Sequence, residues 1–169
     1  KAQKKSVAEL LGGVRRTGMP VVKMLATGDL STDVTDARAG AGDGYAAMKI
    51  KVGGKPVEAD IERTNAIGDA LGGVVQLSSD TNQGWNREEA VSFARGASAV
   101  LDFLEQPVHG RDVEGMAMIA GEADCPIAAD EGLHSFEDVR RHHAMGAAQG
   151  GSVKMIKLGG VTRANQATA

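Results

Sequence analysis

The sequence contains little cysteine, no long hydrophobic run and no excess of charge of one sign. Its single cysteine, Cys125, excludes a disulfide bond within the chain and is typical of a reducing compartment, so we expect a cytoplasmic protein. We expect the Cys125 side chain to be a small buried hydrophobe. No transmembrane run or signal peptide stands out. The net charge of -3, with acids and bases interspersed, gives no reason to expect a nucleic acid or a membrane surface as partner.

The composition is that of a globular domain. Of 169 residues, 42% are hydrophobic and 24% are charged, which supplies enough apolar side chain for a sizeable core. The chain begins at Lys1 rather than at a methionine and ends at Ala169 inside a predicted helix. We therefore expect the sequence to be a fragment of a longer native protein.

Short apolar runs recur at regular intervals along the chain. They lie at residues 21–26, 46–52, 74–79, 100–104, 126–129 and 152–156. The polar segments between them carry helix-start signals, namely Pro56 with Glu58, Asn86 with Glu89, and Ser135 with Asp138. This alternation of strand and helix predicts an α/β protein with a parallel sheet built from right-handed βαβ units.

Charged or polar residues follow the predicted strands, one after another. They are Lys49 and Lys51, Asp80 and Asn82, Glu105, Asp130 and Glu131, and Lys154. In a doubly wound sheet such groups would concentrate at one switch point, whereas in a barrel the carboxyl end of every strand faces one shared mouth. We therefore predict a (β/α)8 barrel of the TIM type, of which about six βα units are present.

Three of these residues suggest a metal site. Asp80, Glu105 and Asp130 follow one another at steps of about 25 residues, so neighbouring strands would bring three carboxylates together at equivalent heights. Such a group is strongly repulsive unless a divalent cation lies between its members. Oxygen ligands favour a hard ion, so we predict Mg²⁺, with Mn²⁺ as a possible substitute.

Lysines lie on either side of the three acids in strand order. Strand alternation places Lys49 and Lys51 on one face of the sheet, with the side chains between them packed outward against helices. Lys51 precedes the acids and Lys154 follows them, so the two ammonium groups would flank the metal. A lysine beside a cation has a lowered pKa, as a general base requires. Lys157 is the competing candidate, because alternation along a strand allows only one of Lys154 and Lys157 to face inward.

Six short motifs carry a resemblance to a known family. They are ELLGG at 9–13, KIKVG at 49–53, DTNQGW at 80–85, FLEQPV at 103–108, ADE at 129–131 and KMIKLGG at 154–160. In order and spacing they resemble the enolase superfamily, and more closely its muconate lactonizing enzyme (muconate cycloisomerase) subgroup. An aspartate as third ligand and a lysine on the sixth strand are similar to that subgroup, whereas mandelate racemases have a glutamate there and a histidine on a later strand.

The resemblance implies roles for the matching residues. It would make Asp80, Glu105 and Asp130 the metal ligands, Lys51 and Lys154 the two acid/base lysines, Lys49 an electrostatic support, and Asn82 a neighbour of the metal or substrate. The implied reaction removes the proton alpha to the carboxylate of a small substrate, through an enolate, and leads to racemisation, epimerisation, cycloisomerisation or dehydration. The family resemblance also implies a homo-oligomer. Residues 1–20 would be the trailing end of a capping domain and a linker, and residues 21–169 a partial barrel without its last strands.

Some residues keep two interpretations. Glu131 is either a partner of Lys154 at the site or the start of the next loop. Trp85 packs over its loop or touches the substrate. His109, His134, His142 and His143 lack the spacing of a metal site, and we expect His142 and His143 on a solvated helix face. Two other functions stay open from the residues alone: a barrel lyase in which a strand lysine forms a Schiff base with a carbonyl substrate, and a truncated module without activity.

Overall fold

The computed structural model describes residues 4–167. Within this range one sheet contains six strands, and their order in the sheet is their order in the chain. The strands are β1 (Val22–Leu25), β2 (Ala47–Lys51), β3 (Gln76–Asp80), β4 (Phe103–Glu105), β5 (Ile127–Ala129) and β6 (Gly150–Gly151), and every neighbouring pair is parallel. Because the order never reverses, the sheet has no switch point, as the predicted barrel requires and a doubly wound sheet does not.

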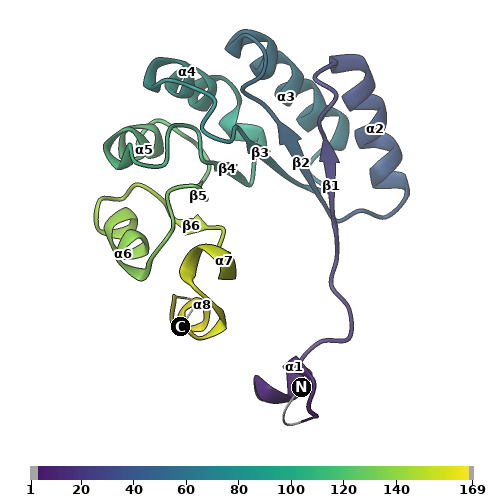
Figure 1. Ribbon diagram of the computed structural model, residues 1–169. Helices are drawn as coiled ribbons and strands as arrows, with labels where there is room; N and C mark the ends of the chain where they lie inside the picture. Colours follow the sequence, from purple (N-terminus) through teal and green to yellow (C-terminus); the bar gives the residue numbers. More distant parts are fainter. Residues whose placement is uncertain (1–3, 168–169) are drawn as a thin grey trace.

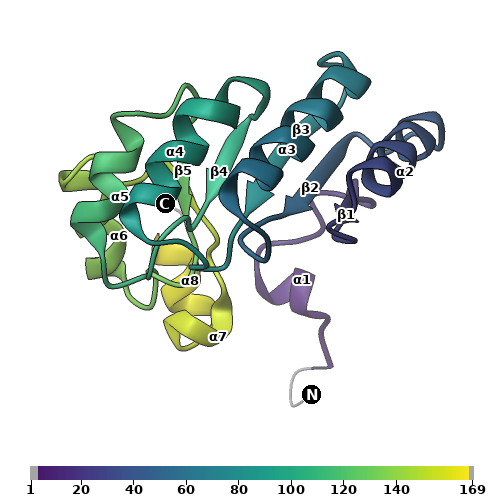
Figure 2. The ribbon, with the colours of Figure 1, turned by 90° about the horizontal axis from the view of Figure 1, so that it is seen from above.

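Helices connect the consecutive strands and lie along the outer, convex side of the curved sheet (Figures 1 and 2). They are α2 (Leu30–Gly42), α3 (Val57–Leu71), α4 (Arg87–Ala97) with the short 3-10 turn η1 (Ser98–Val100), α5 (Val113–Ala120) and α6 (Phe136–Ala144). Two short helices, α7 (Met155–Leu158) and α8 (Val161–Ala167), follow β6 at the end of the arc. Among residues 4–167, none of these helices has the length and apolar character needed to cross a membrane.

The helices begin where the sequence predicts. Asn86 caps α4 by accepting a hydrogen bond from the backbone N–H of Glu89 at 3.0 Å, and the Glu89 carboxylate accepts one from the backbone N–H of Asn86 at 3.0 Å. The Ser135 hydroxyl likewise accepts from the backbone N–H of Asp138 at 3.1 Å and caps α6. Pro56 is the N-cap residue of α3. The side chains of Asn86 and Ser135 satisfy backbone donors that have no partner within the helix, which fixes where α4 and α6 start, whereas Pro56 makes no side-chain hydrogen bond at the start of α3.

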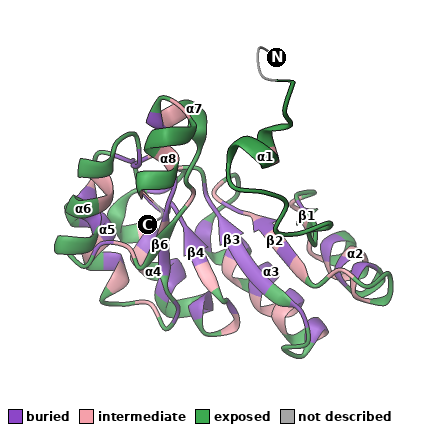
Figure 3. Ribbon diagram, turned by 90° about the horizontal axis from the view of Figure 1, so that it is seen from below, coloured by how far each residue is buried: buried purple, intermediate pink, exposed green. Residues whose placement is uncertain are grey.

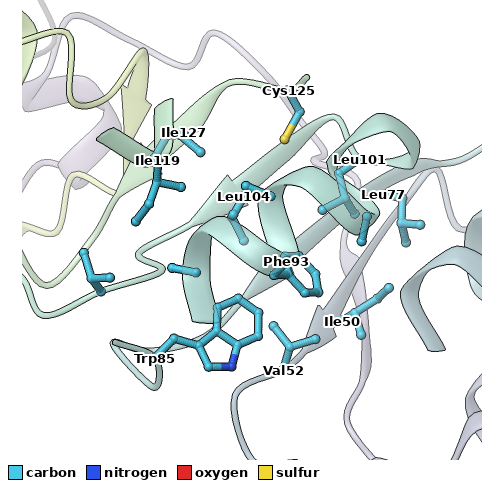
Figure 4. Close-up of a cluster of buried hydrophobic side chains, with 14 of the residues drawn as sticks. Ile50, Val52, Leu77, Trp85, Phe93, Leu101, Leu104, Ile119, Cys125 and Ile127 are labelled. Carbon is cyan, nitrogen blue, oxygen red and sulfur yellow. The ribbon is translucent and has the colours of Figure 1, made fainter. Parts of the chain in front are cut away.

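The hydrophobic core lies between the sheet and its outer helices (Figure 4). The side chains of β2 alternate as expected: Met48 and Ile50 are fully buried on the helix side, while Lys49 and Lys51 point to the other face. Trp85 is buried and its ring centroid lies 4.5 Å from that of Phe93, so its role in packing is confirmed. In Figure 3 buried residues follow the strands and the sheet-facing sides of the helices.

The sixth strand is the main error of the sequence-based prediction. The expected strand at 152–156 is not formed: β6 consists of Gly150 and Gly151, and Lys154 is instead the N-cap residue of α7. Gly159 explains the difference, because its φ of 79° lets the chain close a helical turn at the C-terminus of α7. Lys154 therefore stands on a loop at the start of a helix rather than on a strand.

The N-terminal segment lies apart from the sheet. Its only regular element within the described residues is α1 (Val7–Leu10), and the following residues up to β1 are exposed (Figures 1 and 3). The division into a capping-domain remnant at 1–20 and a barrel at 21–169 stays a prediction. The extreme ends of both regions, residues 1–3 and 168–169, lie outside the described residues.

Candidate active site at the carboxyl ends of the strands

The first two predicted metal ligands lie at matching positions of the sheet. Lys51 pairs in register with Asp80, and Asp80 pairs with Glu105. Asp130 is displaced from the expected height, because Glu105 pairs with Ala128 and Asp130 follows two residues later. An even number of residues keeps Asp130 on the same face of the sheet by alternation. The acids are almost fully buried, at 4% exposure for Asp80, 3% for Glu105 and 3% for Asp130.

Lys49 lies between two of these acids. Its Nζ donates a hydrogen bond to the Glu105 carboxylate and lies 3.9 Å from Oδ2 of Asp80. The register partner of Lys49 on β3 is Ser78, whose small side chain leaves room for the lysine to reach β4. The Ser152 hydroxyl donates to the other Glu105 oxygen at 2.8 Å. The Lys49 ammonium group thus compensates the negative charge of two buried carboxylates. This offsets part of the free-energy cost of burying those charges.

Lys51 contacts the next part of the site. Its Nζ lies 2.5 Å from Oδ2 of Asp80 and 2.6 Å from Oδ1 of Asn82. The Asn82 amide in turn donates to Glu131 at 3.1 Å. Asn82 has a φ of 47°, in the left-handed region that asparagine tolerates better than most residues. Asn82 therefore links a lysine at the end of β2 to the loop after β5, and Glu131 contacts Asn82 rather than only starting a loop.

Two lysines, not one, reach Asp130. Lys154 Nζ donates to Oδ2 of Asp130, while Lys157 Nζ lies 2.5 Å from Oδ1 and 2.8 Å from the backbone oxygen of the same residue. The expectation that only one of the two faces inward is wrong because it assumed a strand. In the helical turn of α7, residues three apart lie on the same side.

The contacts of Asp130 and Lys154 determine the directions in which their pKa values shift. Burial alone would raise the pKa of Asp130, but hydrogen bonds from Lys154 and Lys157 outweigh it, so the pKa lies below its ordinary value. The hydrogen bond to Asp130 raises the pKa of Lys154. The sequence predicted a lowered pKa for a flanking lysine on the assumption of a cation beside it. The groups of the chain itself place Lys154 beside the anion Asp130, which raises its pKa. The lowered pKa expected beside a bound cation stays a prediction.

The carboxylates suit a hard cation by type but are paired with lysines. Within residues 4–167 no set of three or more histidine, cysteine, aspartate or glutamate side chains is arranged to hold a metal ion. The donors are nevertheless all oxygen, and the three acids are buried on one face of the sheet at the carboxyl ends of adjacent strands. The ammonium groups of Lys49, Lys51, Lys154 and Lys157 supply the positive charge beside them. The donor set therefore fits Mg²⁺ in its chemistry.

Gln106 is a supporting residue that the sequence analysis missed. It is fully buried, with a φ of 41°, and its Oε1 accepts from the backbone N–H of Asp130 at 2.8 Å and of Gly132 at 3.1 Å. Its amide donates to the Val108 oxygen at 2.9 Å. The position directly after Glu105, inside the FLEQPV motif, was the available signal. Gln106 holds the backbone that carries Asp130.

The histidines lie outside this group, and one expectation about them is wrong. His143 is exposed as predicted, but His142 is buried because it lies on the inner face of α6, where its Nδ1 contacts the Asp138 oxygen at 2.8 Å.

A cavity of about 760 Å³ between the loops after β4 and β5 is lined by His109, Arg111, Glu131, His134, Arg141 and others. A smaller cavity of about 390 Å³, lined in part by Lys49, Glu105 and Ser152, opens on the lysine–carboxylate group.

Comparison with known proteins gives consistent results. The sequence model of the family described as "Enolase C-terminal domain-like" matches residues 29–169. N-succinyl-L-Arg/Lys racemase of Bacillus cereus is 32% identical over 157 residues, which cover 92% of this chain and 42% of that protein. L-Ala-D/L-Glu epimerase of Bacillus subtilis is 31% identical, with 94% and 48% covered. Muconate cycloisomerase 1-2 of Acinetobacter lwoffii is 32% identical, with 96% and 43% covered.

The fold is shared with a solved structure as well. The crystal structure of muconate cycloisomerase from Pseudomonas fluorescens superposes with a TM-score of 0.88 at 31% identity, covering 96% of this chain and 45% of that one. The chain thus spans about half the length of the curated relatives that it matches. The resemblance drawn from the six motifs is confirmed, and so is the α/β barrel-type fold.

Proposed function

Because this chain belongs to the enolase C-terminal domain-like family, we propose that the protein is an isomerase that removes the proton alpha to the carboxylate of a small substrate. The observation that carries the proposal is the placement of lysines at both ends of the row of buried acids. Lys51 contacts Asp80 at one end, and Lys154 contacts Asp130 at the other. A substrate between them would meet an amine on each side.

The same proposal assigns the metal. Asp80, Glu105 and Asp130 would hold Mg²⁺, with Mn²⁺ as a substitute, because a hard divalent ion prefers carboxylate oxygens. When bound, the ion supplies positive charge that neutralises the acids, attracts the substrate carboxylate and stabilises the negative charge that develops on it.

The lysines would do the proton chemistry. The Lys51 amine takes the α-proton, and the electron pair of the C–H bond passes into the substrate carboxylate to form an enolate. The Lys154 ammonium then donates a proton to the opposite face of the same carbon, which inverts its configuration. Lys51 returns its proton to solvent, and Lys154 takes one up. Lys49, which contacts Glu105, would keep the local potential positive, and Asn82 would orient Lys51 through the contact between them.

The relatives suggest which substrates to try. Their names indicate an N-succinylated amino acid, a dipeptide and muconate. The whole native polypeptide that contains these residues would be incubated with Mg²⁺ in D₂O and N-succinyl-L-arginine or L-Ala-L-Glu, with α-proton loss followed by NMR. Lactone formation from cis,cis-muconate would be followed in parallel by ultraviolet absorbance.

We expect the wild type to act on one of these compounds and Lys51→Ala to lose at least about 100-fold in rate, because a positioned acid or base contributes about 10²- to 10⁴-fold. Lys55→Ala, a change of an exposed lysine four positions further on, is the control and keeps the rate. Retention of activity by Lys51→Ala would contradict the proposal. So would a stable lysine adduct after borohydride reduction with substrate, since that adduct requires a Schiff base.

A further inference from the structure

A second cluster of charged residues lies behind the candidate site, on the helix side of the sheet. Asp33 of α2 and Asp60 of α3 are 0% exposed, and Arg63 of α3 is 3% exposed. The proton chemistry proposed above uses none of them. Because burying charge is costly unless the groups are paired, each of these side chains needs a specific partner.

Arg63 connects the cluster to the backbone of Lys51. Its Nη1 donates to Oδ2 of Asp33 at 2.6 Å, and its Nη2 donates to Oδ1 of Asp60 at 2.9 Å. Nη2 also donates to the backbone oxygen of Lys51. The planar guanidinium thus joins two helices and the last residue of β2 at once. An ammonium group lacks the fixed, forked arrangement of donors that these contacts require.

Each of the two aspartates also accepts a hydrogen bond from a residue that follows a strand. The second oxygen of Asp60 accepts from the backbone N–H of Gly53 at 2.7 Å. The second oxygen of Asp33 accepts from the Thr27 hydroxyl at 2.8 Å, just beyond β1. The segment from Lys51 to Gly53 is therefore held at its first carbonyl by Arg63 and at its last N–H by Asp60.

The sheet itself does not supply this support on the β1 side. The β1–β2 ladder ends at the pair Leu25–Ile50, one residue before Lys51. A partly buried carbonyl beyond the ladder needs another donor, and Arg63 provides it. On the other side Lys51 pairs with Asp80 of β3, and the next residue, Val52, donates its backbone N–H to the Asp80 oxygen at 3.1 Å. The backbone of Lys51 is thus fixed from both sides.

We propose that Arg63 is a positioning residue for Lys51, acting through the backbone of β2. The inference rests on the proposed function, because it assigns Lys51 the proton transfer. Proton transfer depends steeply on where the amine lies, and a misplacement of about 1 Å costs about 100-fold in rate. The substitution Arg63→Lys keeps the positive charge but removes the forked pair of guanidinium nitrogens that makes these contacts. We expect it to lower kcat by about 10- to 100-fold, the effect typical of residues that support a reacting group, and to leave KM and the affinity for Mg²⁺ unchanged.

The experiment uses the whole native polypeptide and the compound that the wild type turns over. The matched control is Arg87→Lys, because Arg87 also forms a fork with an aspartate, Asp112, between neighbouring helices but lies away from Lys51. Circular dichroism and the Mg²⁺-dependent rise in melting temperature establish that each variant is folded. For a substrate with two epimers, such as L-Ala-L-Glu and L-Ala-D-Glu, initial α-proton exchange in D₂O is measured for each.

A fall in kcat for epimerisation without a change in KM, confined to Arg63→Lys, supports the inference when the loss of initial α-proton exchange is larger for the epimer that Lys51 deprotonates. It is overturned if a folded Arg63→Lys keeps kcat within about twofold, if Arg87→Lys loses as much, or if the initial α-proton exchange of both epimers slows equally, since a general structural defect would do that. If Arg63→Lys does not fold, Asp60→Asn is judged by the same criteria. A wild type that acts on none of the compounds overturns the proposed function and this inference together, whereas an active wild type with an unaffected variant overturns the inference alone.

Discussion

The ammonium group of Lys49 illustrates how single residues make this site possible. It contacts Glu105 and lies near Asp80, both almost fully buried. Removing one partner of such a group leaves a buried charge without compensation, which is far more costly than the net value of the pair itself. Individual contacts of this kind, rather than the fold alone, decide which polar side chains the interior accepts.

Cys125 gives a prediction at the same scale. Its side chain belongs to the same buried cluster as Ile127 and Leu104 (Figure 4), and burial raises the pKa of the thiol to about 11. Because only the thiolate reacts, we expect alkylation of Cys125 by iodoacetamide at pH 8 to be slow in the native protein and fast in urea. Mass spectrometry of the Cys125 peptide measures both rates. Equal rates would contradict the burial. Above pH 9 the unfolded chain ionises this thiol first, so its contribution to stability declines as the pH rises toward 11.

Much at the residue scale was predictable, because strand alternation is a local rule. It placed Lys49 and Lys51 opposite Met48 and Ile50 correctly. The supporting contacts of Arg63 and Gln106 were not predictable, since they join positions from different helices and loops whose packing no local pattern reveals. The roles assigned to the acids and lysines stay predictions until the variants are measured.

At the scale of helices and strands, local capping and turn residues explain which sequence-based predictions were correct and which were wrong. The helix starts at Pro56, Asn86 and Ser135 were correct because each depends on side chains within one turn. The predicted strand at 152–156 failed because an apolar run of that length fits a strand or a short helix, and Gly159 favoured the helix.

The capping box of α4 is open to a direct test. Asn86→Ala removes the side chain that accepts from the Glu89 N–H, and we expect the free energy of unfolding to fall by about 1 kcal/mol. Asn86→Asp keeps an acceptor at the same place and serves as the control. Urea denaturation monitored by circular dichroism provides the comparison. Equal losses in both variants would mean that the cap contributes nothing beyond packing.

At the scale of the whole molecule, the candidate site depends on several βα units at once. Its lysines and acids come from β2, β3, β4, the loop after β5 and α7. A cation that joins the three acids would therefore tie these units together, and binding to the folded state alone stabilises that state.

We accordingly expect the melting temperature of the whole native polypeptide to rise with Mg²⁺ and to fall again with EDTA. At a concentration about 100 times the Kd, the stabilisation is about 2.7 kcal/mol. Asp80→Asn should abolish this dependence, because it removes a proposed ligand. Glu122→Gln should keep it, because Glu122 pairs with Arg95 on the surface. A wild-type melting temperature that does not change with millimolar Mg²⁺ would argue against the metal site.

The order of the strands has a consequence for synthesis of the chain. Each strand pairs with the one that precedes it in sequence, from β1 to β6. As the polypeptide leaves the ribosome, every new strand finds its neighbour already in place, so the sheet grows at one edge and each step closes only a short loop. The growing edge stays open until the next strand emerges, so each intermediate exposes one row of unpaired backbone N–H and C=O groups to other chains.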